Sequence, residues 1–557
     1  MRNLVIPILM FVFIGLFLCT GCKKDDSSNP PKPPEPQKIY QSSLINPSYL
    51  DLQAFYDYGY DEIDGDVEIN AVDGLTDMQL LSKVLSIKGY FIVQNNTDLG
   101  SFEGLNNLHT VGGNISIKDN NVLTNIDGLS SLTSISGNLD INTNASLANI
   151  GGLSSLTSIV GNLDINTNAS LANIDGLSSL TSIGGNLSIK NNDEITNIDG
   201  LSSLTSIGGN IDINDNYVLT NIDGLSSLTS IGGNIDINDN YVLTNIDGLS
   251  SLTSIVGNLS IKNNDEITNI DGLSSLTSIG GNISIENNYY YLTNIDGLSS
   301  LTSIGGNIDI IKNYVLTNID GLSSLTSIGG DLNIIDQPNG YTNIDGLSSL
   351  TSIGGNLNIN SSLANFDGLS SLTSIGGNLW IAFNNGSYGP TNIDFLSSLT
   401  SIGGNLVIGS HLRNIDGLSS LTSIGGNLVL SGNHRLTNID GLSSLTSIGG
   451  NLIIENHNNP NTGDHDLKNI DGLSSLTSIG GNLSIENNDG LSNIDGLSNL
   501  TSIGGNLSIS YNSLLYDLCG IRTVLTVNGV GGLINLTFGY FGGNVTAEEI
   551  IAGNCNK

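Results

Sequence analysis

A unit of 24 residues is repeated along most of this chain, and the repetition constrains the fold more than any other feature. The copy at residues 173–196 reads NIDGLSSLTSIGGNLSIKNNDEIT, and one aliphatic position recurs every 24 residues from Ile69 to Ile285. Less regular copies continue to Ile509, which gives 19 copies of the short G-N-L-x-I segment. A constant period of this length predicts a solenoid.

Within one copy the apolar residues are spaced mostly three apart, as at Ile174, Leu177 and Leu180, which fits neither a helical stripe nor a strand. Only the segment 187–189, Leu-Ser-Ile, alternates as a strand does. We therefore expect each copy to form one coil with a short strand and several turns. Stacked coils would pair their strands in a parallel ladder, and the two ends of the stack would need caps.

We expect three kinds of polar or glycine position in each copy to have structural roles. An asparagine three residues after the strand isoleucine, such as Asn192, is expected to point inward and bond the turn backbone. The pair Gly184 and Gly185 is expected to allow a positive φ before the strand. Asp175 and its equivalents are expected to cap the turn that follows them, in preference to forming a ladder of calcium ligands.

The patterns L-x-I-x-x-N-x-x-L, G-L-x-x-L and I-G-G-N-L resemble leucine-rich repeats, most specifically the receptor L-domain type. The resemblance covers about four fifths of the chain. It implies a mainly β, right-handed solenoid of about 19 coils with parallel strand ladders. It also implies a role in binding or display, and it implies no reaction.

The N-terminal segment has the features of a secretion signal. An apolar run at 4–18 is too short to span a membrane, and Cys22 with the small residues before it resembles the lipobox of bacterial lipoproteins. We expect residues 1–21 to be removed and Cys22 to be lipidated. The four residues after Cys22 resemble the export signal of surface lipoproteins of the Bacteroidota: Lys23, Lys24, Asp25 and Asp26. The expected location is the cell surface, anchored in the outer membrane by lipid.

The remaining boundaries follow from changes in the pattern. We expect residues 22–38 to form a tether, because five prolines lie at 29–38. We expect residues 39–62 to form an N-terminal cap that contains a short helix at 48–56. The solenoid is placed at 63–514 and a C-terminal cap at 515–557. With Cys19 removed and Cys22 lipidated, Cys519 and Cys555 remain to form a disulfide within that cap.

Charge and motifs exclude several functions. A formal net charge of −36 argues against nucleic acid and against adhesion to an anionic membrane surface, so the lipid alone would hold the protein there. The sequence has no catalytic or phosphate-binding motif, and we expect a non-enzymatic protein without cofactor or metal. An insertion groups His457, Asp464, His465 and Asp466, but His457 occupies the inward asparagine position, which favours a structural role.

The candidate binding face comes from variation among copies. The outward residue of the strand is serine or aspartate in most early copies, but four later copies carry a row of apolar residues there: Trp380, Val407, Val429 and Ile453. Ile311 and Ile335 are outward and apolar a few copies earlier. Insertions interrupt the period in the same half of the chain, at 289–291, 337–341, 383–390 and around His457. An exposed apolar row predicts a contact surface, unless the insertions fold over the row and bury it.

Two functions remain open from the sequence. The first is a surface-anchored, monomeric lipoprotein that binds protein or glycan through its solenoid, as an adhesin does. The second is a structural rod, a spacer or surface coat without a specific ligand.

Overall fold

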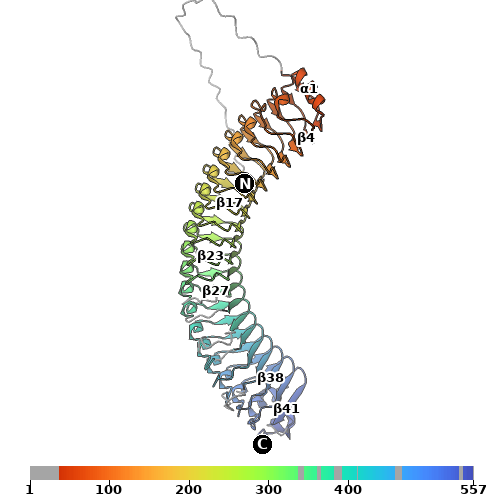
Figure 1. Ribbon diagram of the computed structural model, residues 1–557. Helices are drawn as coiled ribbons and strands as arrows, with labels where there is room; N and C mark the ends of the chain where they lie inside the picture. Colours follow the sequence, from red (N-terminus) through yellow and green to blue (C-terminus); the bar gives the residue numbers. More distant parts are fainter. Residues whose placement is uncertain are drawn as a thin grey trace, which may run out of the picture.

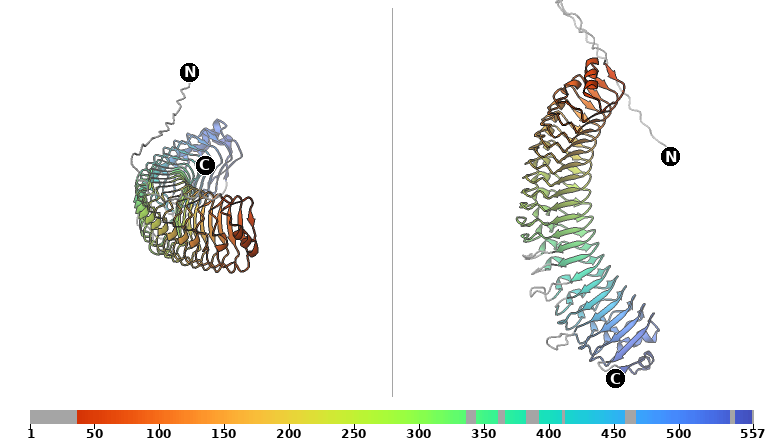
Figure 2. Two further views of the ribbon diagram at one scale, coloured as in Figure 1. Left: turned by 90° about the horizontal axis from the view of Figure 1, so that it is seen from above. Right: turned by 45° about the vertical axis from the view of Figure 1, so that its right-hand side comes forward.

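The coils stack into one long curved rod, as the computed structural model of the protein shows (Figure 1). The structure describes residues 37–335, 344–360, 366–381, 392–409, 412–457, 467–538 and 543–555. The rod begins at the N-terminal helix α1 (Tyr49–Tyr58) and ends at the strands near the C-terminus. Two further views show that the curvature runs along the whole array (Figure 2). The predicted solenoid and its parallel ladders are confirmed.

Each coil contributes one strand to each of two parallel ladders. In the copy at residues 173–196 the short strand is β13 (Ser182–Ile183) and the longer strand is β14 (Leu187–Lys190). A 3₁₀ turn, η5 (Asp199–Leu201), follows at the start of the next copy. Between η2 (Asp127–Leu129) and η17 (Asp495–Leu497) nearly every 3₁₀ turn repeats the Asp-Gly-Leu sequence. The turns lie along the outer side of the curve, at the left in Figure 1. The prediction from the sequence missed the short-strand ladder.

The longer strands form the ladder that carries the candidate face, and each pairs in register with the strand one coil away. Most are four residues long and begin at the Leu or Ile of the G-N-L segment. Their bounds are β4 (Val67–Asn70), β6 (Phe91–Gln94), β8 (Ile115–Lys118), β10 (Leu139–Asn142), β12 (Leu163–Asn166), β14, β16 (Ile211–Asn214), β18 (Ile235–Asn238), β20 (Leu259–Lys262), β22 (Ile283–Glu286), β24 (Ile308–Ile311), β26 (Leu332–Ile335), β28 (Leu357–Asn360), β30 (Leu379–Ile381), β32 (Leu406–Ile408), β34 (Leu428–Ser431), β36 (Leu452–Glu455), β38 (Leu483–Glu486) and β40 (Leu507–Ser510).

The core runs without a break along the inside of the rod. Ile174, Leu177, Leu180 and their equivalents in the other coils are almost completely buried, as are the first and third residues of each longer strand. A single coil could not enclose these side chains, because its two flat faces would stay open. Burial therefore depends on the neighbouring coils, as in other repeat proteins.

The inward asparagines form a hydrogen-bonded ladder that runs without a break from Asn96 to Asn313, which confirms their predicted role. Asn192 is fully buried, and its Nδ2 donates to the carbonyl oxygen of Ile165 in the preceding coil at 2.8 Å. Its backbone N–H donates to Oδ1 of Asn216 in the next coil at 3.2 Å. The side chain of Asn192 thus satisfies two backbone groups of the preceding coil, the carbonyl of Ile165 and the N–H of Asn168, which would otherwise be buried without partners.

The prediction for the paired glycines was wrong. Gly184 and Gly185 do not have a positive φ; that conformation belongs to the residue after the strand, Asn191, with φ 52°. Glycine is required only at the second position, where the coils approach closely. A Cβ at Gly185 would lie 2.1 Å from Oδ1 of Asn162 and 2.9 Å from the carbonyl carbon of Gly161. The position of Gly184 holds valine in two other coils, at Val160 and Val256.

The prediction that aspartate caps the following turn was also wrong. Asp175 is the first residue of its 3₁₀ turn, η4 (Asp175–Leu177), whose start has no side-chain cap. The backbone N–H of Asp175 instead donates to Oδ1 of Asn173, two residues earlier, at 3.2 Å. The asparagine of N-I-D-G therefore makes the turn, in the manner of an Asx-turn, and the aspartate side chain faces outward.

Both ladders extend into the regions expected to be caps. At the N-terminal end β1 (Ile39–Tyr40) pairs with β3 (Glu62–Ile63), and β2 (Leu44–Ile45) pairs with β4. Helix α1 follows, starting one residue later and ending two residues later than the predicted helix, with Ser48 and Asp51 forming a capping box. At the C-terminal end lie α2 (Arg522–Thr526), β41 (Ile534–Phe538), β42 (Gly543–Asn544) and α3 (Ala547–Ile551).

Candidate binding face

The four apolar residues of the predicted row lie side by side on adjacent strands. Trp380 is paired in register with Val407, Val407 with Val429, and Val429 with Ile453. Each is flanked along its strand by two buried residues, so its side chain leaves the opposite side of the ladder. The row ends at polar neighbours, Asn358 before Trp380 and Ser484 after Ile453.

Exposure differs along this row. The side chain of Trp380 is 60% exposed, whereas Val407, Val429 and Ile453 are half-buried between their neighbours. Two of the insertions that could cover the row, and most of the one after His457, lie outside the described residues, as do Ala382 and His411. The row therefore presents one large exposed ring at its head and an aliphatic strip behind it.

Ile311 and Ile335 are placed differently from the other four. They lie on the same outward face but at the last position of β24 and β26, two residues after Asp309 and Asn333. They pair with each other and are half-buried. Because Asn358 separates them from Trp380 along the ladder, they form a second, smaller apolar spot and do not extend the row.

The core next to Trp380 is altered in two adjacent coils. Phe366 and Phe395 replace the usual isoleucine and glycine, and their rings stack with centroids 4.9 Å apart. A small apolar cavity lies between these rings, Leu357 and the inner side of Trp380. This feature was not predicted from the sequence, although the change from Asp-Gly-Leu to Asp-Phe-Leu at 394–396 signals it.

The same face is charged in the first half of the rod. Lys262 forms an ion pair with Glu286 at 2.9 Å, and Lys118 and Lys190 pair with Asp140 and Asp212. Burial first, and then the carboxylate of Asp140, raises the pKa of Asp164. The row thus begins where a ladder face of charged and polar side chains ends.

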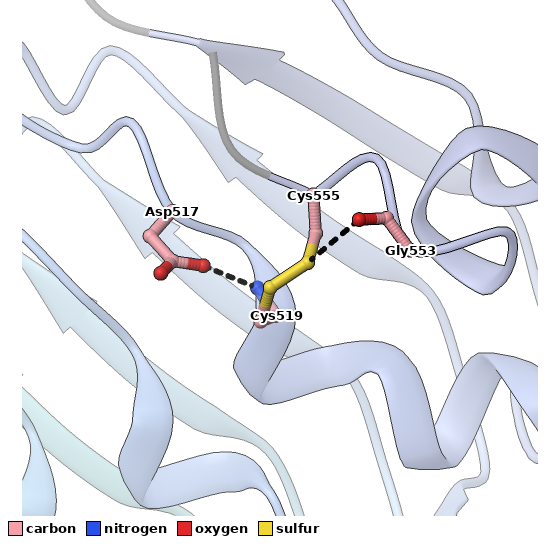
Figure 3. The surroundings of a disulfide bond; sticks show 4 residues. All are labelled: Asp517, Cys519, Gly553 and Cys555. Atoms are coloured by element: carbon pink, nitrogen blue, oxygen red, sulfur yellow. Dashed lines mark hydrogen bonds between the residues drawn. A yellow bond between two sulfur atoms is a disulfide. The ribbon is translucent and has the colours of Figure 1, made fainter.

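The predicted disulfide is present in the C-terminal cap (Figure 3). Cys519 lies in the last 3₁₀ turn, η18 (Cys519–Ile521), and Cys555 follows α3, with their Cα atoms 5.1 Å apart. The backbone N–H of Leu518 donates to the carbonyl oxygen of Cys555 at 2.9 Å. Asp517 lies close to both sulfurs, but the disulfide bond leaves no thiolate there to hold a metal ion.

His457 takes the place of an asparagine in the buried ladder. Its Nδ1 lies 2.9 Å from Oδ1 of Asn488, and burial lowers its pKa to about 4. The structural role predicted for His457 is therefore supported. The acidic and histidine residues of the neighbouring insertion, 464–466, lie outside the described residues.

Family models match the repeats directly. The model for the Receptor L domain matches residues 181–252 and 444–518, and the model for the BspA type Leucine rich repeat region matches 256–388 and 351–459. The repeats of this chain are leucine-rich repeats. Leucine-rich repeats of these two types typically serve as non-enzymatic binding scaffolds. A comparison with curated proteins finds no match.

Several solved structures are similar to this leucine-rich-repeat array. An internalin (inlF) from Listeria monocytogenes is 16% identical, with 64% of this chain and 88% of that chain covered and a TM-score of 0.30. A TLR13–ssRNA13 complex is 16% identical, with 88% and 90% covered and a TM-score of 0.23. The circular leucine-rich-repeat protein CroV588 is 15% identical, with 89% and 91% covered and a TM-score of 0.18.

None of the helices within the described residues combines the length and the apolar character needed to cross a membrane.

Proposed function

We propose that this protein is a surface-anchored lipoprotein that binds another protein through the apolar row of Trp380, Val407, Val429 and Ile453. The observation that carries the proposal is the continuity of the row on four adjacent strands, headed by an exposed tryptophan. Tryptophan is among the residues that contribute most to protein–protein contacts, and aliphatic neighbours help to exclude water around it.

A protein partner fits the row better than a glycan does. Three of the four side chains are aliphatic and half-buried, and they offer neither hydrogen bonds nor flat rings to a sugar. Only Trp380 could stack on a sugar ring. A complementary apolar strip of a protein would cover all four side chains at once.

The row can be tested with the fluorescence of Trp380, because it is the only tryptophan in the chain. Candidate surface proteins, together with a glycan array as the alternative, are screened for binding to the full chain. Binding over the row should shift the Trp380 emission to shorter wavelength. Trp380→Ala and Ile453→Asp should each weaken capture about tenfold or more, with little change in thermal stability.

Two variants serve as controls. Tyr511→Ala removes an exposed ring elsewhere, and Ser484→Asp adds a charge at the outward position beyond Ile453. Capture that is unaffected by Trp380→Ala and Ile453→Asp would reject the row as the site. A search that finds no ligand at all, with normal folding, would favour the alternative function, a structural rod.

Anchorage to the outer face of the outer membrane is part of the proposal and rests on sequence features outside the described residues. Cys22→Ala should abolish lipid labelling and release the protein from the membrane. Replacement of Lys23, Lys24, Asp25 and Asp26 by alanine should keep the lipid but reduce protease access on intact cells. Unchanged access in that variant would reject surface export.

A further inference from the structure

A second exposed surface lies at the turn that leaves the longer strands, several coils before Trp380. In four of five consecutive coils the residue after the buried ladder asparagine is a tyrosine. We call this surface the tyrosine edge; it consists of Tyr217, Tyr241, Tyr289, Tyr290, Tyr291 and Tyr314. Five of the six are more than a third exposed, with Tyr290 the most exposed at 60%.

The rings form two groups that contact one another within each group. Tyr217 and Tyr241 are stacked face to face, with centroids 5.5 Å apart and planes inclined by 4°. In the second group, Tyr289 lies 4.9 Å from Tyr314 and 6.2 Å from Tyr290. A partner would therefore meet rings that already contact one another, and a preformed contact surface lowers the ordering cost of binding.

A carboxylate occupies the position between the two groups. The ladder asparagines Asn240, Asn264 and Asn288 lie on successive coils. The backbone N–H of Asn240 donates to Oδ1 of Asn264, and that of Asn264 donates to Oδ1 of Asn288. The residues that follow them, Tyr241, Asp265 and Tyr289, therefore lie on successive coils too. With strands about 4.8 Å apart, the two tyrosine groups are separated by roughly 10 Å, with Asp265 between them.

The surroundings of the first tyrosine group and of Asp265 are acidic. Asp215 and Asp239 precede Tyr217 and Tyr241 by two residues, and Glu266 follows Asp265, whereas in the second group Lys312 takes the equivalent position before Tyr314. Desolvation first, and then the charges of Asp239 and its neighbours, raises the pKa of Tyr241, so these carboxylates act on the rings. The nearby Lys190 and Lys262 are already paired with Asp212 and Glu286.

We propose that the tyrosine edge binds an extended, arginine-rich segment of a polypeptide. A guanidinium group is planar and positively charged, so it can stack on a tyrosine face while its N–H groups bond a carboxylate. The position of Asp265 between two sets of rings offers both contacts to one side chain. The charge of the edge and the net charge of the chain, −36, complement such a segment. This surface is separate from the apolar row, and its proposal does not depend on it.

The first test measures the role of charge with the full chain and a fluorescein-labelled hexa-arginine peptide. Asp215→Asn combined with Asp239→Asn should weaken binding about threefold to tenfold. The matched control is Asp199→Asn combined with Asp223→Asn, which removes the same charge from the same two coils at the 3₁₀ turns. Equal weakening in both pairs would overturn the proposal, because it would show attraction by net charge alone.

The second test measures the role of the rings by comparing hexa-arginine with hexa-lysine. The native chain should bind the arginine peptide more tightly, and Tyr217→Ser combined with Tyr241→Ser should remove most of that preference. Tyr511→Ser, at another exposed tyrosine, should leave it unchanged. A native chain without a preference for arginine, or a preference that survives the double change, would overturn the proposal.

Folding of the tyrosine variant is checked by circular dichroism. Asp265→Asn provides a variant that keeps every ring. It should weaken hexa-arginine binding, and a native affinity in Asp265→Asn would contradict the proposed position of the guanidinium group.

Discussion

The buried asparagine ladder explains why one residue position is so uniform. Asn192, Asn216 and Asn240 each connect the backbones of neighbouring coils through the same hydrogen bonds. A buried backbone group that loses its partner costs about 1–3 kcal/mol. Substitution of Asn192 would therefore leave two backbone groups of the preceding coil without a partner, the N–H of Asn168 and the carbonyl of Ile165.

His457 replaces asparagine in the ladder, and it predicts a pH effect on stability. The pKa of this histidine is about 4 when folded and about 6.5 when unfolded, because burial disfavours the charged ring. As pH falls below 6.5, the unfolded state takes up a proton first, so stability present at neutral pH is lost on the way to pH 4. The full loss is roughly 3 kcal/mol.

The variant His457→Asn should lack this loss, because asparagine is the usual ladder residue and does not titrate. Denaturant unfolding of both proteins between pH 7 and pH 4 measures the difference. His109→Asn, at an exposed histidine, is the control. If the stability of the native chain and that of His457→Asn change equally with acid, the prediction that His457 is neutral in the folded state is wrong.

At the scale of the coil, close backbone approach is the limiting feature. A Cβ at Gly200 would lie 2.0 Å from the carbonyl oxygen of Ile174 in the preceding coil, so alanine at this position requires the backbone to shift. Gly200→Ala should destabilise the rod by about 2 kcal/mol or more. Gly100→Ala is the control, since the nearest atom lies at an ordinary 3.8 Å.

Native-state hydrogen exchange measures this effect where it occurs. We expect faster exchange in the coils on either side of Gly200 and unchanged exchange in distant coils. Protection that is the same in both variants would show that the stack can absorb a methyl group at this position.

The disulfide stabilises the C-terminal cap. Cys519 and Cys555 are 36 residues apart, and closing such a loop restrains the unfolded chain by roughly 3–4 kcal/mol in the loop-entropy model. Cys519→Ser combined with Cys555→Ser should therefore lower the thermal stability of the cap. Limited proteolysis should then cleave first within 522–555. Native resistance to proteolysis in the double variant would contradict a role of the bond in holding the cap.

The sequence predicted those elements that depend on contacts within one period. The longer strand, the inward leucines and the asparagine ladder all follow from spacing, and strand register then placed Trp380 beside Val407. The short strand of Ser182 and Ile183 was missed because two residues are too few to show an alternation. The role of Gly185 was misjudged because it depends on the distance between coils, which no single copy reveals.

The many aspartates of the molecule predict a contribution to stability that rises when acid is added and falls when base is added. Desolvation, and for most of them neighbouring carboxylates, raises the pKa of several aspartates: Asp164, Asp215, Asp236, Asp247, Asp265, Asp320 and Asp495. A raised folded pKa means that the folded state takes up protons first as pH falls. Their contribution to stability therefore rises as pH falls from 7 toward 4.

This gain opposes the loss from His457, so it is best measured in the His457→Asn variant. The melting temperature of that variant should rise as pH falls from 7 to 5, and it should rise with added salt at pH 7, where salt screens the repulsion. The effect of salt should shrink near pH 4. A melting temperature that falls with acid in this variant would show that repulsion between carboxylates does not limit the rod.

Two adjacent coils of the rod, residues 197–220 and 221–244, have identical sequences. Deletion of 221–244 would join Thr220 to Asn245, and the new junction would have the same sequence on both sides as the junction it replaces. Every ladder contact at the seam would be preserved, and the rod would be shorter by one strand spacing, about 4.8 Å. The length of this molecule can thus change in fixed steps through unequal exchange between its own repeats, while the row at Trp380 and both caps stay intact.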